Sequence, residues 1–272
     1  MDFIRQALDL ARAGTGLGEN VESPPLVHGS AGTGPVVIDP QIEKVELNAA
    51  HLESTRIVAS GPTDQHGRYY DMLRTQVLQA MDKNSWQFLA ITSPTAGCGK
   101  TVTACNLALS IARLPERSVL LVDMDLQKPK ISEYLGINRK EGLLSVLDGR
   151  ATLLSRIVHA RLGRTQMLVL PSEQCKSGSS EWMASKTMST LLQTIKREFR
   201  SRIVIFDLPP LLIGDDVISI LPQMDAALLV AGVGTTTVSD IKECQKHLQT
   251  TPVVRVLVNK VTETADSYNA YY

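Results

Sequence analysis

The feature that most constrains this 272-residue chain is a glycine-rich turn, Gly97-Cys-Gly-Lys-Thr101, between an apolar run at 86–91 and a helix-like run at 102–113. A strand, a glycine turn, Lys-Thr and a helix in this order are typical of a loop that binds nucleotide phosphates. The two glycines let the backbone turn tightly, so that amide N–H groups approach phosphate oxygens at the positive end of the helix. Pro94 stands where the full phosphate-loop (P-loop) pattern has glycine, so the match is partial.

The residues of this turn are the predicted nucleotide-binding residues. Lys100 can reach β- and γ-phosphate oxygens, and the Thr101 hydroxyl can bind Mg²⁺. The alternative is a strand-to-helix turn without a ligand, which the Gly-x-Gly-Lys-Thr pattern in this context disfavours. The predicted cofactor contacts are Thr95, Ala96, Gly97, Cys98, Gly99, Lys100, Thr101 and Val102.

Composition excludes several other classes of protein. The 28 basic and 28 acidic residues balance, which argues against a strongly basic nucleic-acid-binding protein. The four cysteines form no Cys-x-x-Cys pair, which is typical of reduced thiols in the cytoplasm rather than of a disulfide framework. No apolar run approaches the ~18 residues that span a bilayer. We therefore expect a cytoplasmic protein that reaches a membrane only through a partner.

Patterning along the chain predicts four parts. Residues 1–13 have apolar side chains at three- and four-residue steps, as in a short amphipathic helix. Residues 14–66, rich in glycine, proline and serine over their first half, are predicted to be a flexible linker. Residues 67–262 form the main domain, and residues 263–272 form a tyrosine-rich tail.

Within the main domain, strand and helix patterns alternate. Helices are predicted from about residue 67 to 81 and at 100–113, 182–198 and 236–249. Several strands are almost uniformly apolar, which suits a parallel sheet covered on both faces. The predicted fold is a doubly wound, mostly parallel α/β sheet that binds its ligand at the carboxyl ends of the strands. The strands are predicted at 87–92, 118–123, 166–170, 202–207, 226–231 and 253–259.

Carboxylates follow two of these strands. Asp123 is the last residue of the strand at 118–123, and Asp125 follows two residues later. Side-chain alternation would point the two carboxylates the same way. Asp207 is the last residue of the apolar strand at 202–207, and Leu208 and two prolines follow it. This pattern is typical of a carboxylate that holds a metal directly or through water. The alternative for the first pair is an ordinary acidic exit from a strand. Beside the glycine turn, we favour one carboxylate as a metal ligand and the other as a proton acceptor.

Two further features point to chemistry at the same end of the sheet. Asn259 ends the last predicted strand, where its amide could read a purine edge, although asparagine there is more often turn chemistry. Three of the six tyrosines, Tyr268, Tyr271 and Tyr272, lie in the last five residues. Tyrosines in a terminal tail contribute little to a core and are accessible hydroxyl groups.

Together these residues resemble the bacterial tyrosine kinases, the P-loop autokinases associated with capsule and exopolysaccharide assembly. The resemblance covers about residues 68–272 and rests on Ser93–Thr101, Asp123-Met-Asp125, Asp207-Leu-Pro-Pro210 and the tyrosine-rich end. The opening Asp2-Phe-Ile-Arg-Gln-Ala-Leu segment and the linker look like the stand-alone branch of that family. In that branch the kinase works with a separate membrane co-polymerase, or chain-length protein, and is recruited by it to the inner membrane.

The resemblance implies a mechanism. ATP and Mg²⁺ would bind at Gly97–Thr101, with Asp125 and Asp207 near the metal and Asp123 accepting the tyrosine proton. Lys100, Asp123, Asp125 and Asp207 would be the catalytic residues. The γ-phosphoryl group would pass to the tail tyrosines, Tyr268, Tyr271 or Tyr272, of a neighbouring subunit in a homo-oligomer. A protein-tyrosine phosphatase would reverse the reaction.

Two other functions stay open. A partner-positioning ATPase of the cell-division or plasmid-partition (MinD/ParA) type shares this fold, but such proteins have a second lysine where Thr95 stands. A nucleotide-binding scaffold for a membrane polymerase is the other possibility. Gln127 replaces an arginine that is common in the kinase family, and Asp71 replaces an arginine of its usual interface pattern, Glu-x-x-Arg-x-x-Arg. Both departures motivate the scaffold hypothesis.

Overall fold

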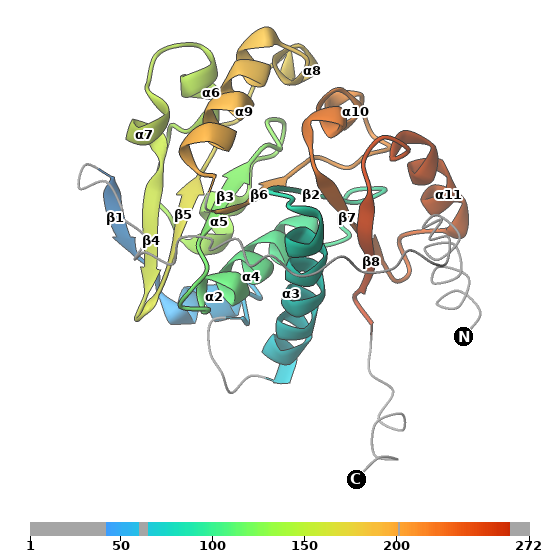
Figure 1. The fold of residues 1–272 in the computed structure, drawn as a ribbon, viewed down its shortest axis with the longest axis horizontal. Helices are drawn as coiled ribbons and strands as arrows, with labels where there is room; N and C mark the ends of the chain where they lie inside the picture. Colours follow the sequence, from blue (N-terminus) through green and yellow to red (C-terminus); the bar gives the residue numbers. More distant parts are fainter. Residues whose placement is uncertain (1–41, 60–64, 201, 262–272) are drawn as a thin grey trace, which may run out of the picture.

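An eight-stranded sheet between two layers of helices forms the centre of the molecule (Figure 1). The computed structural model describes residues 42–59, 65–200 and 202–261. Within them the sheet order is β1-β4-β5-β3-β6-β2-β7-β8. The strands are β1 (Glu43–Glu46), β2 (Phe88–Thr92), β3 (Val119–Asp123), β4 (Val158–Leu162), β5 (Thr165–Leu170), β6 (Ile203–Asp207), β7 (Ala226–Gly232) and β8 (Val253–Asn259).

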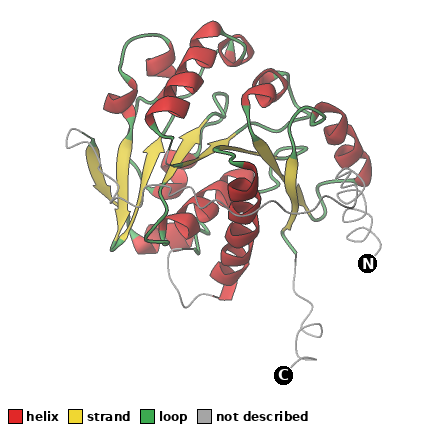
Figure 2. Ribbon diagram, viewed as in Figure 1, coloured by secondary structure: helices red, strands yellow, loops and turns green. Residues whose placement is uncertain are grey.

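Helices connect the strands and cover both faces of the sheet (Figure 2). The helices are α2 (Ala49–Ser54), α3 (Gln65–Asn84), α4 (Lys100–Ala112), α5 (Ile131–Leu135), α6 (Leu143–Leu147), α7 (Leu153–Arg156), α8 (Ser179–Met183), α9 (Lys186–Glu198), α10 (Asp216–Ile220) and α11 (Val238–His247), with a 3₁₀ turn at Leu221–Gln223. In the sequence, α3 precedes β2, and α4 begins directly after the glycine turn.

Six neighbouring strands run parallel, from β5 across to β8. β4 is antiparallel to β5, and β1 pairs with β4 in parallel, so these two strands run against the rest. The predicted mostly parallel α/β sheet is therefore confirmed, with a reversed pair at one edge. The central strands β2, β3 and β6 are buried at every position, which explains their uninterrupted apolar sequences.

Alternating side chains of each strand enter two separate cores. Leu89 and Ile91 of β2 pack with α2, α3, α4 and α5 on one face. Phe88 and Ala90 pack with α6, α8, α9 and α10 on the other. Burial on both faces fixes the register of each strand, because a one-residue slip would exchange the two sets of side chains. The rigid sheet edge that results positions the residues described below.

The segment predicted as part of a flexible linker is a folded part of the domain. β1 and α2 lie within residues 14–66, and α3 begins at Gln65 rather than near Gly67. Leu52 and Ile57 are fully buried in the core that also contains α4. We call residues 42–59 the N-terminal strap. Its apolar residues occur in short groups separated by charged and polar residues, so no single helix or strand period runs through the segment.

The side chain of Asn106, fully buried in α4, attaches the N-terminal strap to that helix. Its Oδ1 accepts the backbone N–H groups of Val58 and Ala59 at 2.7 and 2.9 Å. Its Nδ2 donates to Arg56 O at 3.0 Å and to Val102 O at 2.8 Å. One amide thus satisfies four backbone groups, which would otherwise be buried without partners.

Other predicted elements differ in detail. The helix expected at 182–198 is two helices, α8 and α9, because Ser185 caps the second by accepting the Met188 N–H. Strand β4 and the short helices α5, α6, α7 and α10 have no counterpart among the predicted elements. Each has only four or five residues, too few to establish a period. Residues 1–41 and 262–272, which include the predicted amphipathic helix and tyrosine tail, lie outside the described residues.

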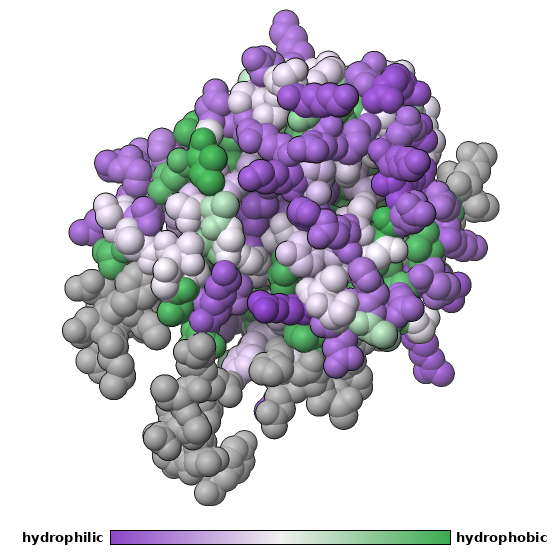
Figure 3. All heavy atoms as spheres, turned by 180° about the vertical axis from the view of Figure 1, so that it is seen from behind, coloured by the Kyte–Doolittle hydropathy of each residue, from purple (hydrophilic) through white to green (hydrophobic). Residues whose placement is uncertain are grey.

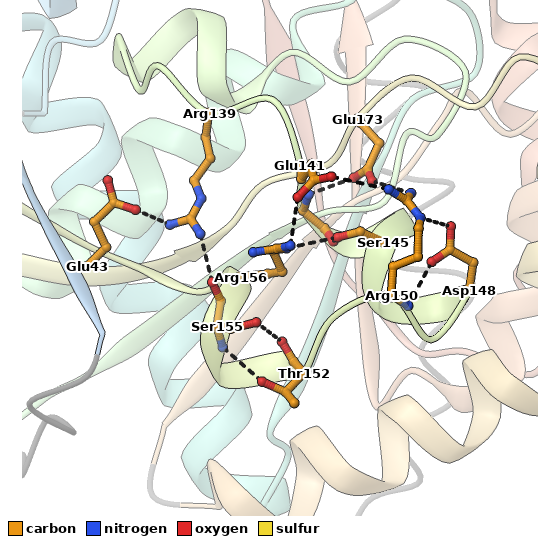
Figure 4. Close-up of polar contacts among 11 residues, drawn as sticks. Glu43, Arg139, Glu141, Ser145, Asp148, Arg150, Thr152, Ser155, Arg156 and Glu173 are labelled. Atoms are coloured by element: carbon orange, nitrogen blue, oxygen red, sulfur yellow. Dashed lines mark hydrogen bonds and ion pairs between the residues drawn. The ribbon is translucent and has the colours of Figure 1, made fainter.

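A network of ion pairs joins the loops around α6 and α7 to the rest of the domain (Figure 4). Arg139 pairs with Glu43 of β1, and Arg156 pairs with Glu141 at 2.6 Å. Arg150 contacts Glu141, Asp148 and Glu173 at 3.2, 2.7 and 3.4 Å. Each pair has at least one exposed partner, since Glu43, Glu141 and Arg150 are 58%, 47% and 53% exposed, so we assign the network a modest stabilising role.

The surface seen from behind is mostly hydrophilic, with separate apolar patches (Figure 3). None of the helices among the described residues is long and apolar enough to cross a membrane. On α3, Asp71 is held within the chain, because it accepts from Arg74 at 3.0 Å, Arg113 at 3.2 Å and Ser110 Oγ at 2.6 Å. The residue that departs from the family's interface pattern therefore links α3 to α4.

Candidate active site

The glycine turn leads directly from β2 into α4. Gly97 and Gly99 have φ of 81° and 92°, a left-handed conformation that glycine adopts without steric cost. Gly99 is the N-cap of α4, and no side chain caps the helix there. The first N–H groups of α4 are therefore available to an anion, and the helix dipole adds positive potential at the same place.

Lys100 lies between two carboxylates. Its Nζ donates to Asp125 Oδ2 at 2.8 Å and lies 3.6 Å from Asp207 Oδ1. The Thr101 hydroxyl is 3.4 Å from the same ammonium group. Burial alone would lower the pKa of Lys100, but the charges of Asp207 and Asp125 outweigh it and raise the pKa above its ordinary value. Lys100 is therefore a fixed positive charge at the start of the helix.

Asp207 is the most deeply enclosed acid of the group. It ends β6, in register with Asp123 of β3 and with Ile91 of β2. Its side chain is fully buried, and neither carboxylate oxygen has a hydrogen-bond partner. Burial raises its pKa, and the charge of Lys100 opposes that rise. An unsatisfied buried carboxylate is costly, so its retention points to a ligand that engages its oxygens.

Asp123 and Asp125 occupy different environments although only one residue separates them. Asp123 Oδ2 accepts the N–H groups of Lys130 and Ile131 at 3.0 and 2.9 Å, and its Oδ1 accepts that of Asp125 at 3.3 Å. Burial, and next the charge of Asp207, hold the pKa of Asp123 well above its usual range. Asp125 Oδ1 accepts only the Lys128 N–H, at 3.0 Å, and its Oδ2 faces Lys100. Asp123 therefore holds the backbone of the loop after β3, and Asp125 faces Lys100.

A cavity of about 220 Å³ opens beside these groups. The glycine turn, the start of α4 and Asp125 all contribute to its lining. Asp123 and Asp207 lie behind this lining rather than in it. The volume is below the ~300–1,000 Å³ of pockets that enclose a whole small ligand, so part of a nucleotide would lie outside the cavity. The lining residues are Ala96, Gly97, Gly99, Lys100, Thr101, Val102, Asp125, Gln127, Lys128, Lys130, Tyr134, Pro209, Pro210, Ile213, Gly214 and Asp216.

Cys98 and Asn259 hold the glycine turn in place from the other side. Asn259 Nδ2, at the end of β8, donates to Cys98 O at 2.9 Å. The Cys98 thiol, fully buried, lies 3.4 Å from Thr236 Oγ1, which also accepts the Gly232 N–H at 3.0 Å. Hydrogen bonds from Thr236 and Thr95 outweigh burial and lower the pKa of this thiol. The amide predicted to read a purine edge is thus engaged with the backbone of the turn.

Several cavity residues were absent from the sequence prediction. Gln127 Nε2 donates to Ser179 Oγ at 3.1 Å and to Asp216 Oδ2 at 3.0 Å, so it ties the loop after β3 to α8 and α10. Ile213 lines the cavity and is 59% exposed. The sequence offered one signal for these residues, because 126–130 and 208–216 directly follow strands that end in acids. Ligands in open α/β sheets bind at such ends.

The oxygen groups around Lys100 suit a magnesium ion that arrives with a nucleotide. Among the described residues, no three histidine, cysteine, aspartate or glutamate side chains are arranged to hold a metal ion by themselves. Mg²⁺ is commonly bound by one or two carboxylates together with substrate phosphates. Asp207 with its unsatisfied oxygens, Asp125 and the Thr101 hydroxyl provide that partial set. The donors therefore fit Mg²⁺, with phosphate oxygens completing its coordination.

Comparison with known proteins agrees with this geometry. The model of the CobQ/CobB/MinD/ParA nucleotide-binding domain matches residues 89–271. The putative tyrosine-protein kinase EpsB of Ralstonia nicotianae is 29% identical over 212 residues, which are 78% of this chain and 28% of that protein. The tyrosine-protein kinase CpsD of Streptococcus pneumoniae is 27% identical over 206 residues, 75% of this chain and 88% of that one. The chain thus spans less than a third of EpsB and most of CpsD.

Solved structures show the same arrangement. The kinase domain of the Escherichia coli tyrosine kinase ETK superposes with a TM-score of 0.70 at 27% identity, covering 78% of this chain and 82% of that domain. The septum site-determining protein MinD of Pyrococcus horikoshii, complexed with Mg-ADP, gives a TM-score of 0.51 at 21% identity. It covers 61% of this chain and 67% of MinD, and at this identity the likeness shows the fold alone.

Proposed function

This chain belongs to the CobQ/CobB/MinD/ParA nucleotide-binding family, and from that premise we propose that it is an ATP-dependent protein-tyrosine autokinase. The observation that carries the proposal is the cavity that Lys100, Thr101 and Asp125 line together. Such a cavity can hold a terminal phosphoryl group and leave an open side for an acceptor. The curated relatives EpsB and CpsD, both named tyrosine-protein kinases, support tyrosine as the acceptor.

The proposed reaction is in-line transfer. The phenolic oxygen of a tail tyrosine forms a bond to the γ-phosphorus while the bond from that phosphorus to the β–γ bridging oxygen breaks. ADP leaves with the electron pair, and the phenolic proton passes to a carboxylate. Such transfer depends mainly on positioning and charge neutralisation. Lys100 and the free N–H groups of α4 supply positive charge, and a bound Mg²⁺ would supply more.

We assign the proton to Asp125 rather than to Asp123, the acceptor that the family resemblance implies. Asp125 lines the cavity, so an incoming hydroxyl can reach it. Asp123 is 1% exposed, and both of its oxygens already accept backbone N–H groups. In this proposal Asp123 is a positioning residue for the loop that carries Asp125. Asp207 and the Thr101 hydroxyl would hold the metal, and Asp125 takes the proton in place of the metal-ligand role that its position also allows.

The cellular role follows from the relatives and is part of the proposal. Kinases of exopolysaccharide and capsule loci suggest that this chain regulates polymer assembly and export. We propose that a membrane co-polymerase recruits it to the inner membrane, that a homo-oligomer presents the tail tyrosines Tyr268, Tyr271 and Tyr272 to neighbouring subunits, and that a protein-tyrosine phosphatase reverses the labelling.

Phosphotyrosine mapping tests the proposal. The purified chain, incubated with ATP and Mg²⁺, should gain phosphate in the peptide that contains Tyr268, Tyr271 and Tyr272, as detected by mass spectrometry. Lys100→Met should remain unlabelled. A wild-type chain that binds ATP but gains no phosphotyrosine would refute the proposed function.

The same experiment separates the alternatives. Release of free phosphate without labelled protein would favour a MinD/ParA-like ATPase, and nucleotide binding with neither product would favour a scaffold. Thr95 stands where those ATPases have a second lysine, and its backbone carbonyl accepts the Ser93 hydroxyl at 2.8 Å. This position therefore offers no cation to the phosphates, which supports the kinase over the ATPase.

A further inference from the structure

We propose that two residues of the N-terminal strap, His51 and Thr55, are positioning residues for phosphoryl transfer. They hold the C-terminal end of α5, and α5 in turn fixes the loop of residues 124–130, which carries Asp125. The inference rests on the proposed kinase function, and it assigns to the same site two residues that act on it only through another element.

The strap meets α5 through hydrogen bonds to two backbone carbonyl groups. His51 Nε2 donates to Glu133 O at 2.8 Å. Thr55 Oγ1 donates to Tyr134 O at 2.8 Å, a shorter distance than the 3.0 Å to either carbonyl group within its own helix turn. Both acceptors lie in the last turn of α5, where carbonyl groups have no donor further along the helix. The strap therefore supplies donors that α5 cannot supply itself.

Packing at the end of α5 shows how closely the two elements approach. Gly136 caps α5 with φ of 69°, and a Cβ built there would lie 2.9 Å from His51 Cδ2. Leu52 of the strap and Leu135 of α5 are fully buried in the same core. Both helices lie on the face of the sheet that α4 covers (Figure 1). The contact is thus a packed interface rather than two isolated hydrogen bonds.

The other end of α5 is held by Asp123. Its Oδ2 accepts the N–H groups of Lys130 and Ile131, the residues at which α5 begins. A helix of five residues is too short to be stable alone, so its position depends on its end contacts and its buried side chains. Asp123 and the strap provide the contacts at the two ends.

The position of α5 matters for transfer because this helix borders the cavity. Tyr134 of α5 lines the cavity together with Asp125. Residues 124–130 join β3 to α5, so a shift of α5 would move the Asp125 carboxylate. A displacement of about 1 Å among reacting groups can lower a rate about 10²-fold. The two strap residues would therefore act on catalysis through the backbone of α5.

The effect should fall on the rate rather than on nucleotide binding. In the proposed function the phosphates bind at the glycine turn and the first turn of α4, whereas the loop before α5 carries the proton acceptor. Loss of the strap contacts should therefore slow tail labelling and leave the affinity for an ATP analogue nearly unchanged. A purely structural role would lower the free energy of unfolding without separating the two quantities.

The test compares variants of the full-length chain. Thr55→Val removes the hydroxyl group and keeps the shape, and His51→Leu removes the other donor. The double variant should label its tail at least about tenfold more slowly, with the dissociation constant of a non-hydrolysable ATP analogue within about twofold of wild type. Thr55→Ser and His51→Gln each keep a donor and should retain most of the rate. Ser54→Ala is the matched control, because Ser54 Oγ donates within the strap, to His51 O at 2.7 Å.

Urea denaturation establishes that each variant is folded under the assay conditions. If the double variant is not folded, Thr55→Val alone provides the comparison and should slow labelling about threefold. Labelling at the wild-type rate by a folded variant would overturn the proposal. So would a loss of rate that an equal loss of affinity for the ATP analogue accounts for.

Hydrogen exchange distinguishes failure of this inference from failure of the kinase proposal. Amide exchange in a peptide of residues 127–138, measured by mass spectrometry with the ATP analogue bound, requires no transfer. Faster exchange there in the double variant than in Ser54→Ala would support the positioning of α5 even if no phosphotyrosine forms. Phosphotyrosine formation with exchange equal in the two variants would preserve the kinase and overturn the role of His51 and Thr55.

Discussion

Lys100 Nζ lies 2.8 Å from Asp125 Oδ2, so an ammonium group stands between the carboxylates that suit a divalent cation. Both partners are largely buried, with side chains 12% and 7% exposed. Lys100 thus offsets part of the negative charge of Asp125 and Asp207. Phosphate binding would draw Lys100 toward the nucleotide and free Asp125 and Asp207, so nucleotide and metal should bind together rather than separately.

The first prediction concerns metal binding without nucleotide. Wild-type protein should bind Mn²⁺ weakly, and Lys100→Met should bind it about tenfold more tightly or better, because a positive charge next to the carboxylates is removed. Electron paramagnetic resonance of free Mn²⁺ measures this directly. Lys100→Met combined with Asp207→Asn should lose the gain. Equal Mn²⁺ affinity in wild type and Lys100→Met would contradict the prediction.

The second prediction separates Asp125 from Asp123 in catalysis. Asp125→Asn should lower the rate of tail labelling about 10²- to 10⁴-fold, the usual contribution of a proton acceptor. Binding of an ATP analogue, measured by calorimetry, should persist. Asp123→Asn should instead weaken the loop that holds Asp125, because an amide keeps one acceptor oxygen and cannot accept both the N–H groups of Lys130 and Ile131 and that of Asp125. If Asp125→Asn labels its tail at the wild-type rate, the assignment of the proton is wrong.

The third prediction concerns the N-terminal strap. Asn106→Ala leaves the buried N–H groups of Val58 and Ala59 without an acceptor, so the free energy of unfolding should fall by about 2–4 kcal/mol. Urea denaturation measures the change, and limited proteolysis should show faster cleavage near residues 55–60. Asn84→Ala is the control, because that exposed amide makes one bond, to Ala80 O, and should cost less than about 1 kcal/mol. Equal losses in the two variants would exclude the proposed attachment.

The fourth prediction is a pH dependence of stability. His159 on β4 is 4% exposed, its Nε2 bonds to Gln166 Oε1 at 3.1 Å, and its Nδ1 has no partner. Burial lowers its pKa, so the folded state favours the neutral ring. The stability this provides is present above the ordinary pKa of about 6.5 and is lost as the pH falls through the lowered value. Urea denaturation from pH 7 to pH 5 should show a decline that is smaller in His159→Phe, and parallel curves for the two proteins would count against it.

The fifth prediction concerns Gly142, which begins α6. A Cβ built there would lie 2.0 Å from Pro171 O, which also accepts the Leu143 N–H at 2.8 Å. Gly142→Ala should therefore destabilise the protein by about 3 kcal/mol or more, because two backbone segments must separate. Thermal unfolding checks this. The matched control is Gly214→Ala, where no atom lies within 4 Å of the added Cβ, and a comparable loss there would rule out the steric cause.

How much of the fold the sequence reveals depends on the length of each element and on how continuous its apolar sequence is. The central strands and α4 were predictable, because a run of five buried residues, or a thirteen-residue helix with eleven buried residues, leaves a clear pattern. β1, β4 and α5 were not, since these elements of four or five residues mix polar and apolar side chains and take their conformation from tertiary contacts. The N-terminal strap is held by Asn106, an interaction across 47 or 48 residues that no local pattern records.

The candidate site also has features that the sequence predicts and features that it does not. Lys100, Thr101, Asp125 and the glycines belong to patterns in which spacing itself reflects chemistry, and the structure brings them together. The outward position of Asp125 and the enclosed position of Asp123 depend on the loop that returns at Lys130, which spacing does not reveal. Lys128 and Ile213 share a cavity only because β3 and β6 are adjacent in the sheet.

The amide of Asn106 has a thermodynamic consequence for the whole chain. It connects the backbone at Arg56–Ala59 to the helix whose first turn would receive phosphate. Any event that pulls the strap away changes the energy of that helix, and occupancy at the first turn must alter the cost of detaching the strap by an equal amount. A protein that binds the chain on the N-terminal side of Glu43 and detaches the strap would therefore change the affinity for nucleotide. Bound nucleotide would change the affinity for that protein by the same factor.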